Sequence, residues 1–113
     1  MRRVNALESV VTGSGSYDFV LKWGTTGTGA GQFRYPISVA TDSIGDVYVA
    51  DLHNHRVQKF NSTGTFILEW GSYGSGDGQF NYNYGVAVDS SDNIYVADGT
   101  NSRIQKFTST GTF

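Results

Sequence analysis

Cysteine is absent from this 113-residue chain, and proline occurs once, as Pro36. Without cysteine the chain can form neither disulfides nor zinc sites built on thiolates. Runs of lysine or arginine are missing too, and the net charge is −2. Because contacts to phosphates need clustered cations, we expect no general nucleic-acid partner.

Long hydrophobic segments are also missing. The start of the chain, MRRVNALESVV, has a basic pair but no long apolar stretch, and no later segment could cross a bilayer. The sequence therefore predicts a soluble protein with no signal peptide and no membrane partner, and its compartment stays undetermined. Apolar residues amount to only 38%, whereas aromatic residues reach 14%, a balance that favours strands over helices.

What the chain does contain is an internal repeat. When the sequence is shifted by 47 positions, residues 19–65 align with residues 66–112 without a gap, and 27 of the 47 positions are identical. Each unit has four short segments rich in β-branched and aromatic residues, bounded by turn residues. The predicted strands are 19–23, 38–42, 47–51 and 56–60, then 66–70, 85–89, 94–98 and 103–107. Four antiparallel strands followed by a longer crossover are typical of a β-propeller blade.

The two units resemble NHL repeats, a family of β-propeller blades. The resemblance rests on YVADLHNHRVQKF and YVADGTNSRIQKF, and on the Gly-Gln-Phe and Trp-Gly pairs that recur in both copies. It implies an all-β fold with two four-stranded blades, from repeats 19–65 and 66–113, preceded by a segment 1–18 outside the repeat. One departure is Asn83, where the family usually has proline, and we expect it to loosen the entry to the next strand.

The glycine-rich stretches WGTTGTGAGQF and WGSYGSGDGQF have two readings, a phosphate-binding loop or a backbone crossover. A phosphate loop needs Lys-Ser or Lys-Thr after its last glycine and a helix to receive the phosphate. Here Gln-Phe follows, and a strand is predicted next. We therefore expect these glycines to supply positive φ angles where the chain crosses between blades.

A second recurrent set surrounds the turn between the second and third strands. Carboxylate and amide side chains at such a turn can bond its own N–H groups, and a nearby arginine can pair with the carboxylate. Because the set occurs in both blades, we expect a structural role and not a catalytic pair. Its members are Asp51, Asn54, Arg56, Asp98, Asn101 and Arg103.

The two histidines, His53 and His55, lie in one turn, where the second repeat has Thr100 and Ser102. No cysteine or local carboxylate trio in the sequence completes a zinc site with them, and no Ser-His-Asp order or nucleophile elbow occurs. We therefore predict a protein that is not an enzyme and that needs no metal or cofactor.

Two blades leave two apolar sheet faces uncovered, whereas closed propellers have about four to eight blades. The resemblance implies six blades, which three copies of the chain would supply. Residues 19–23 form an outer strand without a blade, and the blade of 85–107 has no outer strand. We therefore expect 19–23 of one copy to complete the blade of the next, in a homotrimeric ring. Rings of four or five copies, or a fragment of a longer propeller, are the alternatives.

Because strands alternate in direction, loops 24–37, 52–55, 71–84 and 99–102 should share one face of the disc, called here the loop face. Its tyrosines combine flat apolar surface with hydrogen bonding. The candidate ligand-binding residues are Arg34, Tyr35, His53, His55, Tyr73, Tyr82 and Tyr84. For Tyr35 and Tyr82, which recur in both repeats, packing against the neighbouring blade is the other reading.

The predicted function is a binding scaffold whose loop face takes a protein, peptide or glycan. Two alternatives come from the resemblance, which extends to lyases with metal-bound histidines and to propellers that recognise RNA on a basic face. Zinc that is lost on His53→Ala would favour the first alternative, and salt-sensitive retention of RNA would favour the second.

Overall fold

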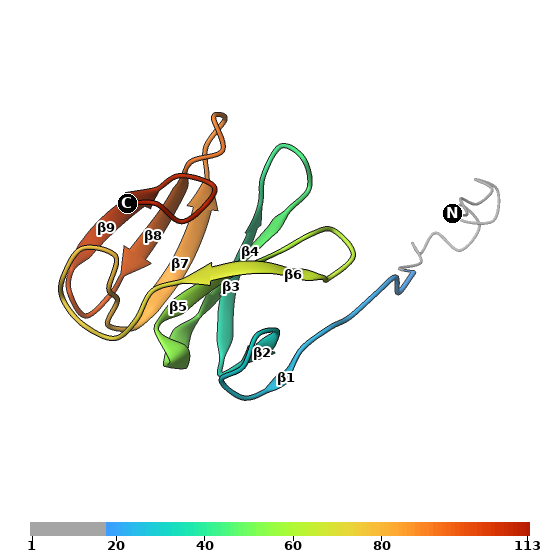
Figure 1. Cartoon of the computed structure of the whole chain (residues 1–113), viewed down its shortest axis with the longest axis horizontal. Helices are drawn as coiled ribbons and strands as arrows, with labels where there is room; N and C mark the ends of the chain where they lie inside the picture. Colours follow the sequence, from blue (N-terminus) through green and yellow to red (C-terminus); the bar gives the residue numbers. More distant parts are fainter. Residues whose placement is uncertain (1–17) are drawn as a thin grey trace, which may run out of the picture.

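The computed structural model describes residues 18–113, which form two antiparallel sheets side by side (Figure 1). The first sheet has the order β3 (Pro36–Thr41), β4 (Val47–Asp51), β5 (Arg56–Phe60) and β6 (Phe66–Trp70). The second has the order β7 (Asn83–Val88), β8 (Ile94–Asp98) and β9 (Arg103–Phe107). Between residues 18 and 113, the only helical element is the 3-10 turn η1 (Leu52–Asn54), and no helix could span a membrane. The prediction of an all-β fold with antiparallel sheets is confirmed.

Most predicted strands have the predicted bounds. The segments 38–42 and 85–89 differ, because β3 and β7 begin two residues earlier and end one residue earlier. The parallel pair β1 (Thr25–Thr26) and β2 (Gln32–Phe33) within the first crossover was not predicted. Residues 19–23 are exposed and pair with no strand among the described residues, although the ring of Trp23 at the end of this segment contacts the first sheet (Figure 1). Their pairing with another copy therefore stays a prediction.

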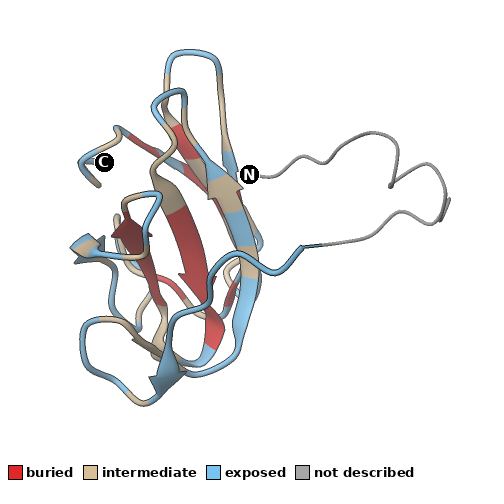
Figure 2. Cartoon of the chain, turned by 90° about the vertical axis from the view of Figure 1, so that its right-hand side faces the viewer, coloured by how far each residue is buried: buried red, intermediate tan, exposed pale blue. Residues whose placement is uncertain are grey.

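The hydrophobic core lies between the two sheets, where β3 and β4 pack against β7. Side chains alternate between the two faces of a strand, so each sheet directs one apolar set toward the other. The first sheet contributes Tyr48, Ala50 and Val57, and the second contributes residues that include Ile94 and Phe107. Buried residues are accordingly concentrated on the strands (Figure 2), and outside the strands only Phe80 and Leu52 are buried among the described residues.

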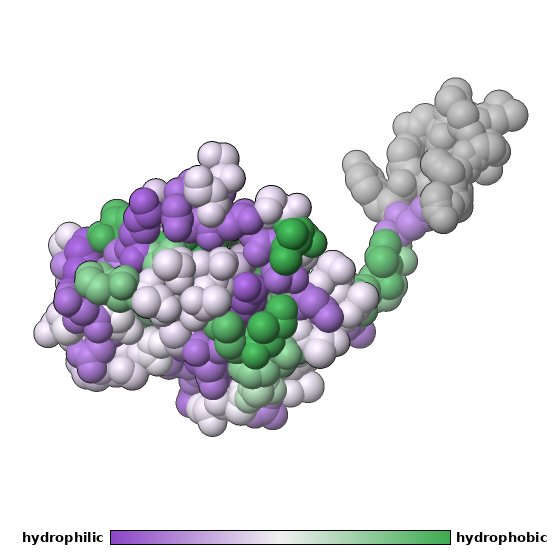
Figure 3. All heavy atoms as spheres, turned by 45° about the horizontal axis from the view of Figure 1, so that its top comes forward, coloured by the Kyte–Doolittle hydropathy of each residue, from purple (hydrophilic) through white to green (hydrophobic). Residues whose placement is uncertain are grey.

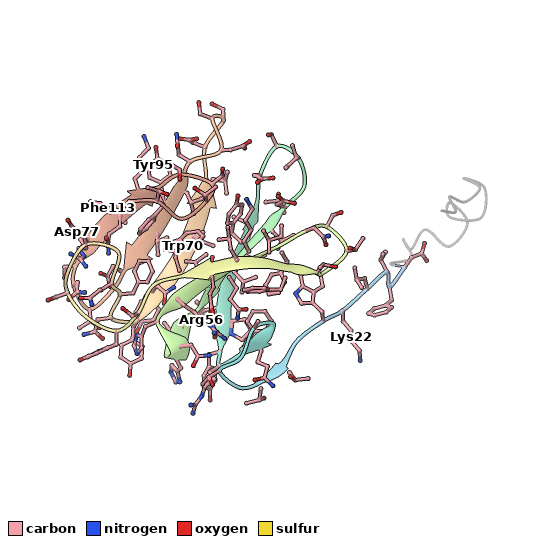
Figure 4. All side chains as sticks on the ribbon, viewed as in Figure 1. Lys22, Arg56, Trp70, Asp77, Tyr95 and Phe113 are labelled. Atoms are coloured by element: carbon pink, nitrogen blue, oxygen red, sulfur yellow. The ribbon has the colours of Figure 1, made fainter. Side chains whose placement is uncertain are left out.

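Two tryptophans link neighbouring parts of the structure in the same way. Trp70, at the end of β6, lies between the sheets, with its ring 5.4 Å from that of Phe107 (Figure 4). Trp23 makes the matching contact to the first sheet, 5.5 Å from Phe60. A Cβ atom at Gly64 would lie 2.9 Å from the Trp23 ring, so only glycine fits beneath that ring.

The glycine-rich stretches are backbone crossovers, as predicted. Gly24 has φ +110°, and its counterpart Gly71 has φ +108°, in the region that side chains disfavour. Space is short as well, because a Cβ atom at Gly24 would lie 2.8 Å from the Phe33 ring. Each crossover then enters a strand, β3 or β7, and no helix.

Candidate functional site

A buried polar cluster ties the first crossover loop to the turn between β4 and β5. Asp51 at its centre is fully buried. Its Oδ1 accepts a hydrogen bond from the backbone N–H of Arg34 at 2.7 Å. Its Oδ2 accepts bonds from Asn54 at 2.9 Å and from Nε of Arg56 at 2.8 Å. One carboxylate therefore holds the loop, the turn and the start of β5 together.

Arg56 extends this cluster along the crossover loop. Its Nη1 donates to the carbonyl of Thr28 at 2.8 Å and to Oε1 of Glu69 at 2.7 Å. Its Nη2 donates to the carbonyls of Gly29 at 3.0 Å and Gln32 at 2.7 Å. Because a guanidinium offers five donors in a rigid fork, this one side chain can fix the loop over several residues.

The second sheet carries the same cluster around Asp98, which is also fully buried. Asp98 accepts bonds from the N–H of Asn81 at 2.7 Å, from Asn101 at 2.9 Å and from Nε of Arg103 at 2.8 Å. Burial alone would raise the pKa of Asp98, but these bonds and the Arg103 charge together lower it below its usual value. Within residues 18–113, the salt bridge to Asp98 is the only one that Arg103 makes.

The structure corrects the predicted role of these polar residues in one respect. The aspartate–arginine ion pair is present, but the aspartates bond the N–H groups of the crossover loops and not those of their own turn. Sequence reasoning also missed Gln58, whose Nε2 donates to the carbonyl of Gln32 at 2.6 Å and whose Oε1 accepts from Gly31 at 2.8 Å. Its identity in both repeats, two positions after the arginine, was the available signal.

Asn83 does not loosen the entry to β7, so that prediction is wrong. The residue is fully buried, and its Nδ2 donates to the backbone carbonyl of Arg56 at 2.7 Å. This bond joins β7 of the second sheet to β5 of the first. Pro36, at the same place in the first repeat, has no side-chain donor for such a bond.

Five rings form a continuous line across the loop face, called here the aromatic row. Its neighbouring ring centroids are 4.4 Å apart for Tyr35 and His53, 5.7 Å for His53 and Tyr82, and 4.9 Å for Tyr82 and His55. Tyr73 ends the row, 5.1 Å from His55. The row begins on loops of the first sheet and continues over the loop that enters the second, so it crosses the junction between the sheets.

Histidine His55 joins the two sheets within the row. Its Nδ1 accepts a hydrogen bond from the backbone N–H of Tyr82 at 3.1 Å, which requires a neutral ring with its proton on Nε2. Partial burial, followed by the charge of His53, lowers the pKa of His55. The neutral form is therefore favoured, and the row carries no positive charge from His55 near neutral pH.

The outer members of the row are open to solvent, with 65% of Tyr35 and 66% of Tyr73 exposed. Tyr82, between the two histidine rings, is 38% exposed and so both packs and faces outward. Beside the row lies an open hollow of about 520 Å³ whose lining includes His53, His55 and Tyr73. The structure thus combines aromatic surface, two imidazoles and a depression in one place.

The two remaining candidate residues lie outside the row. Arg34 is exposed next to Tyr35, and Tyr84 is 53% exposed with its ring against Gly99. The structure therefore gathers five of the seven predicted ligand-binding residues. In the described part of the chain, no group of three or more histidine, aspartate or glutamate side chains is placed to hold a metal ion.

The sequence is similar to known proteins that contain NHL repeats. A family model described as "NHL repeat" matches residues 33–60 and 85–107. The chain is 48% identical over 48 residues to human "NHL repeat-containing protein 3", covering 41% of this chain and 14% of that protein. It is 46% identical over 43 residues to "B-box type zinc finger protein ncl-1" of Caenorhabditis elegans, covering 38% of this chain and 5% of that protein.

A further similarity, 44% over 43 residues, is to "Protein brain tumor" of Drosophila melanogaster, covering 38% of this chain and 4% of that protein. The chain thus aligns with one short part of each of these relatives. The segments that the family model matches, 33–60 and 85–107, include the buried Asp51 and Asp98 at the centres of the two polar clusters.

Proposed function

Because the chain belongs to the NHL-repeat proteins, we propose that it is a non-enzymatic binding module that docks a protein or peptide on its loop face. The observation that carries this proposal is the aromatic row, which crosses the junction between the two sheets and has exposed tyrosines at both ends. Tyrosine and histidine rings offer apolar area and hydrogen bonds while losing little conformational entropy on binding. A glycan, which also stacks on such rings, is the second ligand class to test.

The clusters around Asp51 and Asp98 support this proposal by holding the loops that carry the row. The N–H of Arg34, adjacent to Tyr35, is bonded to a buried carboxylate at 2.7 Å, and the N–H of Asn81, adjacent to Tyr82, is bonded in the same way. A surface held in place before binding loses less entropy when the ligand arrives. Rigid support and exposed rings together are what a docking surface needs.

The test is a binding screen with peptide and glycan arrays, followed by variants of the row. Tyr73→Ala and His53→Ala should each weaken the binding of any captured ligand by about fivefold or more, because truncating an aromatic hot-spot contact costs about 1 kcal/mol or more. Tyr84→Ala is the matched control, since this tyrosine is 53% exposed and its ring lies against Gly99 of loop 99–102, outside the row. Equal losses in all three variants would contradict a site centred on the row.

We propose in addition that the module is completed by further copies of itself, three of which would form a six-bladed ring. Support comes from the two sheet faces that the described chain leaves open, because large apolar faces mark association surfaces. In the proposed binding module, His53 and His55 have no catalytic role. Zinc bound in a fixed ratio, and lost on His53→Ala, would contradict that part.

A further inference from the structure

Within one chain, one apolar face of the first sheet packs against one apolar face of the second sheet. Because the two sheets are repeats of each other, each also has the counterpart of its partner's packed face, and that counterpart face has no neighbouring sheet among the described residues. Val57 on β5 is fully buried by the second sheet, whereas its counterpart Ile104 on β9 is 65% exposed. Val86 on β7 is 9% exposed against the first sheet, whereas its counterpart Val39 on β3 is 63% exposed. The chain thus offers both sides of an interface that it already forms once internally.

We propose that the two open faces pack against each other between copies, an inference that rests on the proposed self-assembly. Residues 19–23 of one copy then form the outer strand beside β9 of the next copy. This junction between copies is weaker than the internal junction. The occupant of each face is therefore a second copy of this chain. The interface between copies would use the counterparts of the strands that form the internal interface, in the same order.

The apolar contacts of the internal junction carry over with little change. Its core residues Tyr48, Ala50 and Val57 correspond to Tyr95, Ala97 and Ile104. On the opposite side, the core residues of the second sheet have apolar counterparts in the first, Phe33, Val39, Val47, Val49 and Phe60. Figure 4 shows Tyr95 on the side of the second sheet away from the first, and Figure 3 shows hydrophobic atoms at the surface near the N-terminal segment. Val39 and Ile104 are the most open members of the two halves, whereas Val49 and Phe60 are already buried within the single chain.

The strand pairing carries over as well. β5 and β6 place Val57 opposite Trp70, and a shift of one repeat places Ile104 opposite Trp23 of the second copy. Trp70 reaches the tyrosine of the first sheet, Tyr48, at 6.3 Å between centroids. Trp23, the last residue of 19–23, already packs on its own first sheet, so this segment ends at the open face that the β9 edge of the other copy would approach.

In the single chain, Phe113 lies where the first residue of this outer strand would lie beside β9. Its ring lies 6.0 Å from Phe107, as the ring of Phe66 lies 6.0 Å from Phe60. Phe19 of the second copy aligns with Phe113 by the repeat and would take its place. The β9 edge therefore accepts this side chain in the geometry that the exchange requires.

Polar contacts distinguish the two junctions. Inside the chain, Asp92 accepts bonds from the N–H and hydroxyl of Ser43, but the counterpart of Asp92 is Gly45. The N–H of Val86 donates to the hydroxyl of Ser38 at 3.2 Å, but the counterpart of Ser38 is Gly85. Both bonds are therefore lost between copies, and so is the Asn83 bond described above.

Charge also distinguishes the two junctions. Inside the chain, Glu69 on the outer strand accepts a hydrogen bond from Arg56 at 2.7 Å. Its counterpart on 19–23 is Lys22, which would lie beside Arg103 of the other copy. A favourable ion pair is thus replaced by two like charges, which weaken association and are screened by salt.

The test measures the association constant of the full chain by sedimentation velocity, over a range of protein and sodium chloride concentrations. Wild-type association should tighten as salt screens the repulsion. Lys22→Glu should associate roughly five- to tenfold more tightly per junction at low salt, and should loosen as salt rises. Arg34→Glu, with the same charge change on the loop face, should show neither effect.

An apolar pair of variants tests the same junction. Ile104→Ser, on the proposed face, should weaken association about tenfold or more, whereas Ile44→Ser, in the exposed β3–β4 turn, should leave it unchanged. If wild type associates but neither Lys22→Glu nor Ile104→Ser alters its association, copies assemble by another surface and this junction is wrong. If wild type and Lys22→Glu both remain single copies at every concentration, the proposed assembly and the junction both fail.

Discussion

Replacing Arg56 with lysine should destabilise the chain more than the same change at Arg103. Arg56 is 7% exposed and donates five hydrogen bonds, to two carboxylates and three backbone carbonyls. A lysine ammonium at the end of a flexible stem can stay near Asp51 but cannot reach all these acceptors at once. The buried acceptors that remain would lose partners and have little water to replace them.

The expected cost at Arg56 is about 3 kcal/mol, since bonds to charged groups contribute about 1.5–3 kcal/mol each and lysine retains some of them. At Arg103 the side chain is 28% exposed and donates to Asp98 and two carbonyls, so water can replace part of the loss. We expect about 1 kcal/mol there.

Urea denaturation at one fixed chain concentration measures both values, because assembly makes apparent stability depend on concentration. A difference of about 2 kcal/mol corresponds to a difference of roughly 1–2 M in the urea midpoint. An Arg103→Lys variant that is as unstable as Arg56→Lys would refute the reasoning, since burial and bond count would then not decide the cost.

Two further predictions follow from single positions. The pKa of His55 is lowered from 6.5 in the folded chain, so the unfolded chain binds more protons below that pH. The free energy of unfolding should therefore fall as the pH drops below 6.5. Urea midpoints between pH 5 and 8 measure this loss, which should be absent in His55→Ser. Gly64→Ala should cost about 2–4 kcal/mol, because a Cβ atom would lie 2.9 Å from the Trp23 ring at φ +87°. Gly45→Ala, at φ +91° with its nearest neighbour 3.9 Å away, should cost only the backbone strain of about 1–2 kcal/mol; equal thermal midpoints for the two alanine variants would show that the ring contact is unimportant.

The strands could be predicted because each strand pattern occurs in both copies of the repeat. RVQKF and RIQKF differ at one position, and both form strands with the predicted bounds, β5 and β9. The crossover glycines were predictable for a similar reason, since the loops lacked the residues of a phosphate site. Local pattern and recurrence were enough for these elements.

Contacts between the loops and the strands were harder to predict, because they depend on backbone angles that a sequence does not display. Tyr35 and Tyr82 take left-handed φ angles of 65° and 63°, which turn their rings toward the histidines of the aromatic row. Gln58 bonds to a loop 26 residues away, and Asn83 reaches a carbonyl 27 residues away. Such partners become visible only when the sheets are placed in space.

We propose that the open faces of this chain are covered by other copies of the same chain. The mass of the purified chain in solution, measured by sedimentation equilibrium, tests it most directly. Assembly into the proposed ring predicts about 37 kDa at high concentration, three times the 12.3 kDa of one chain. A folded protein that stays at 12.3 kDa throughout the concentration range would contradict it.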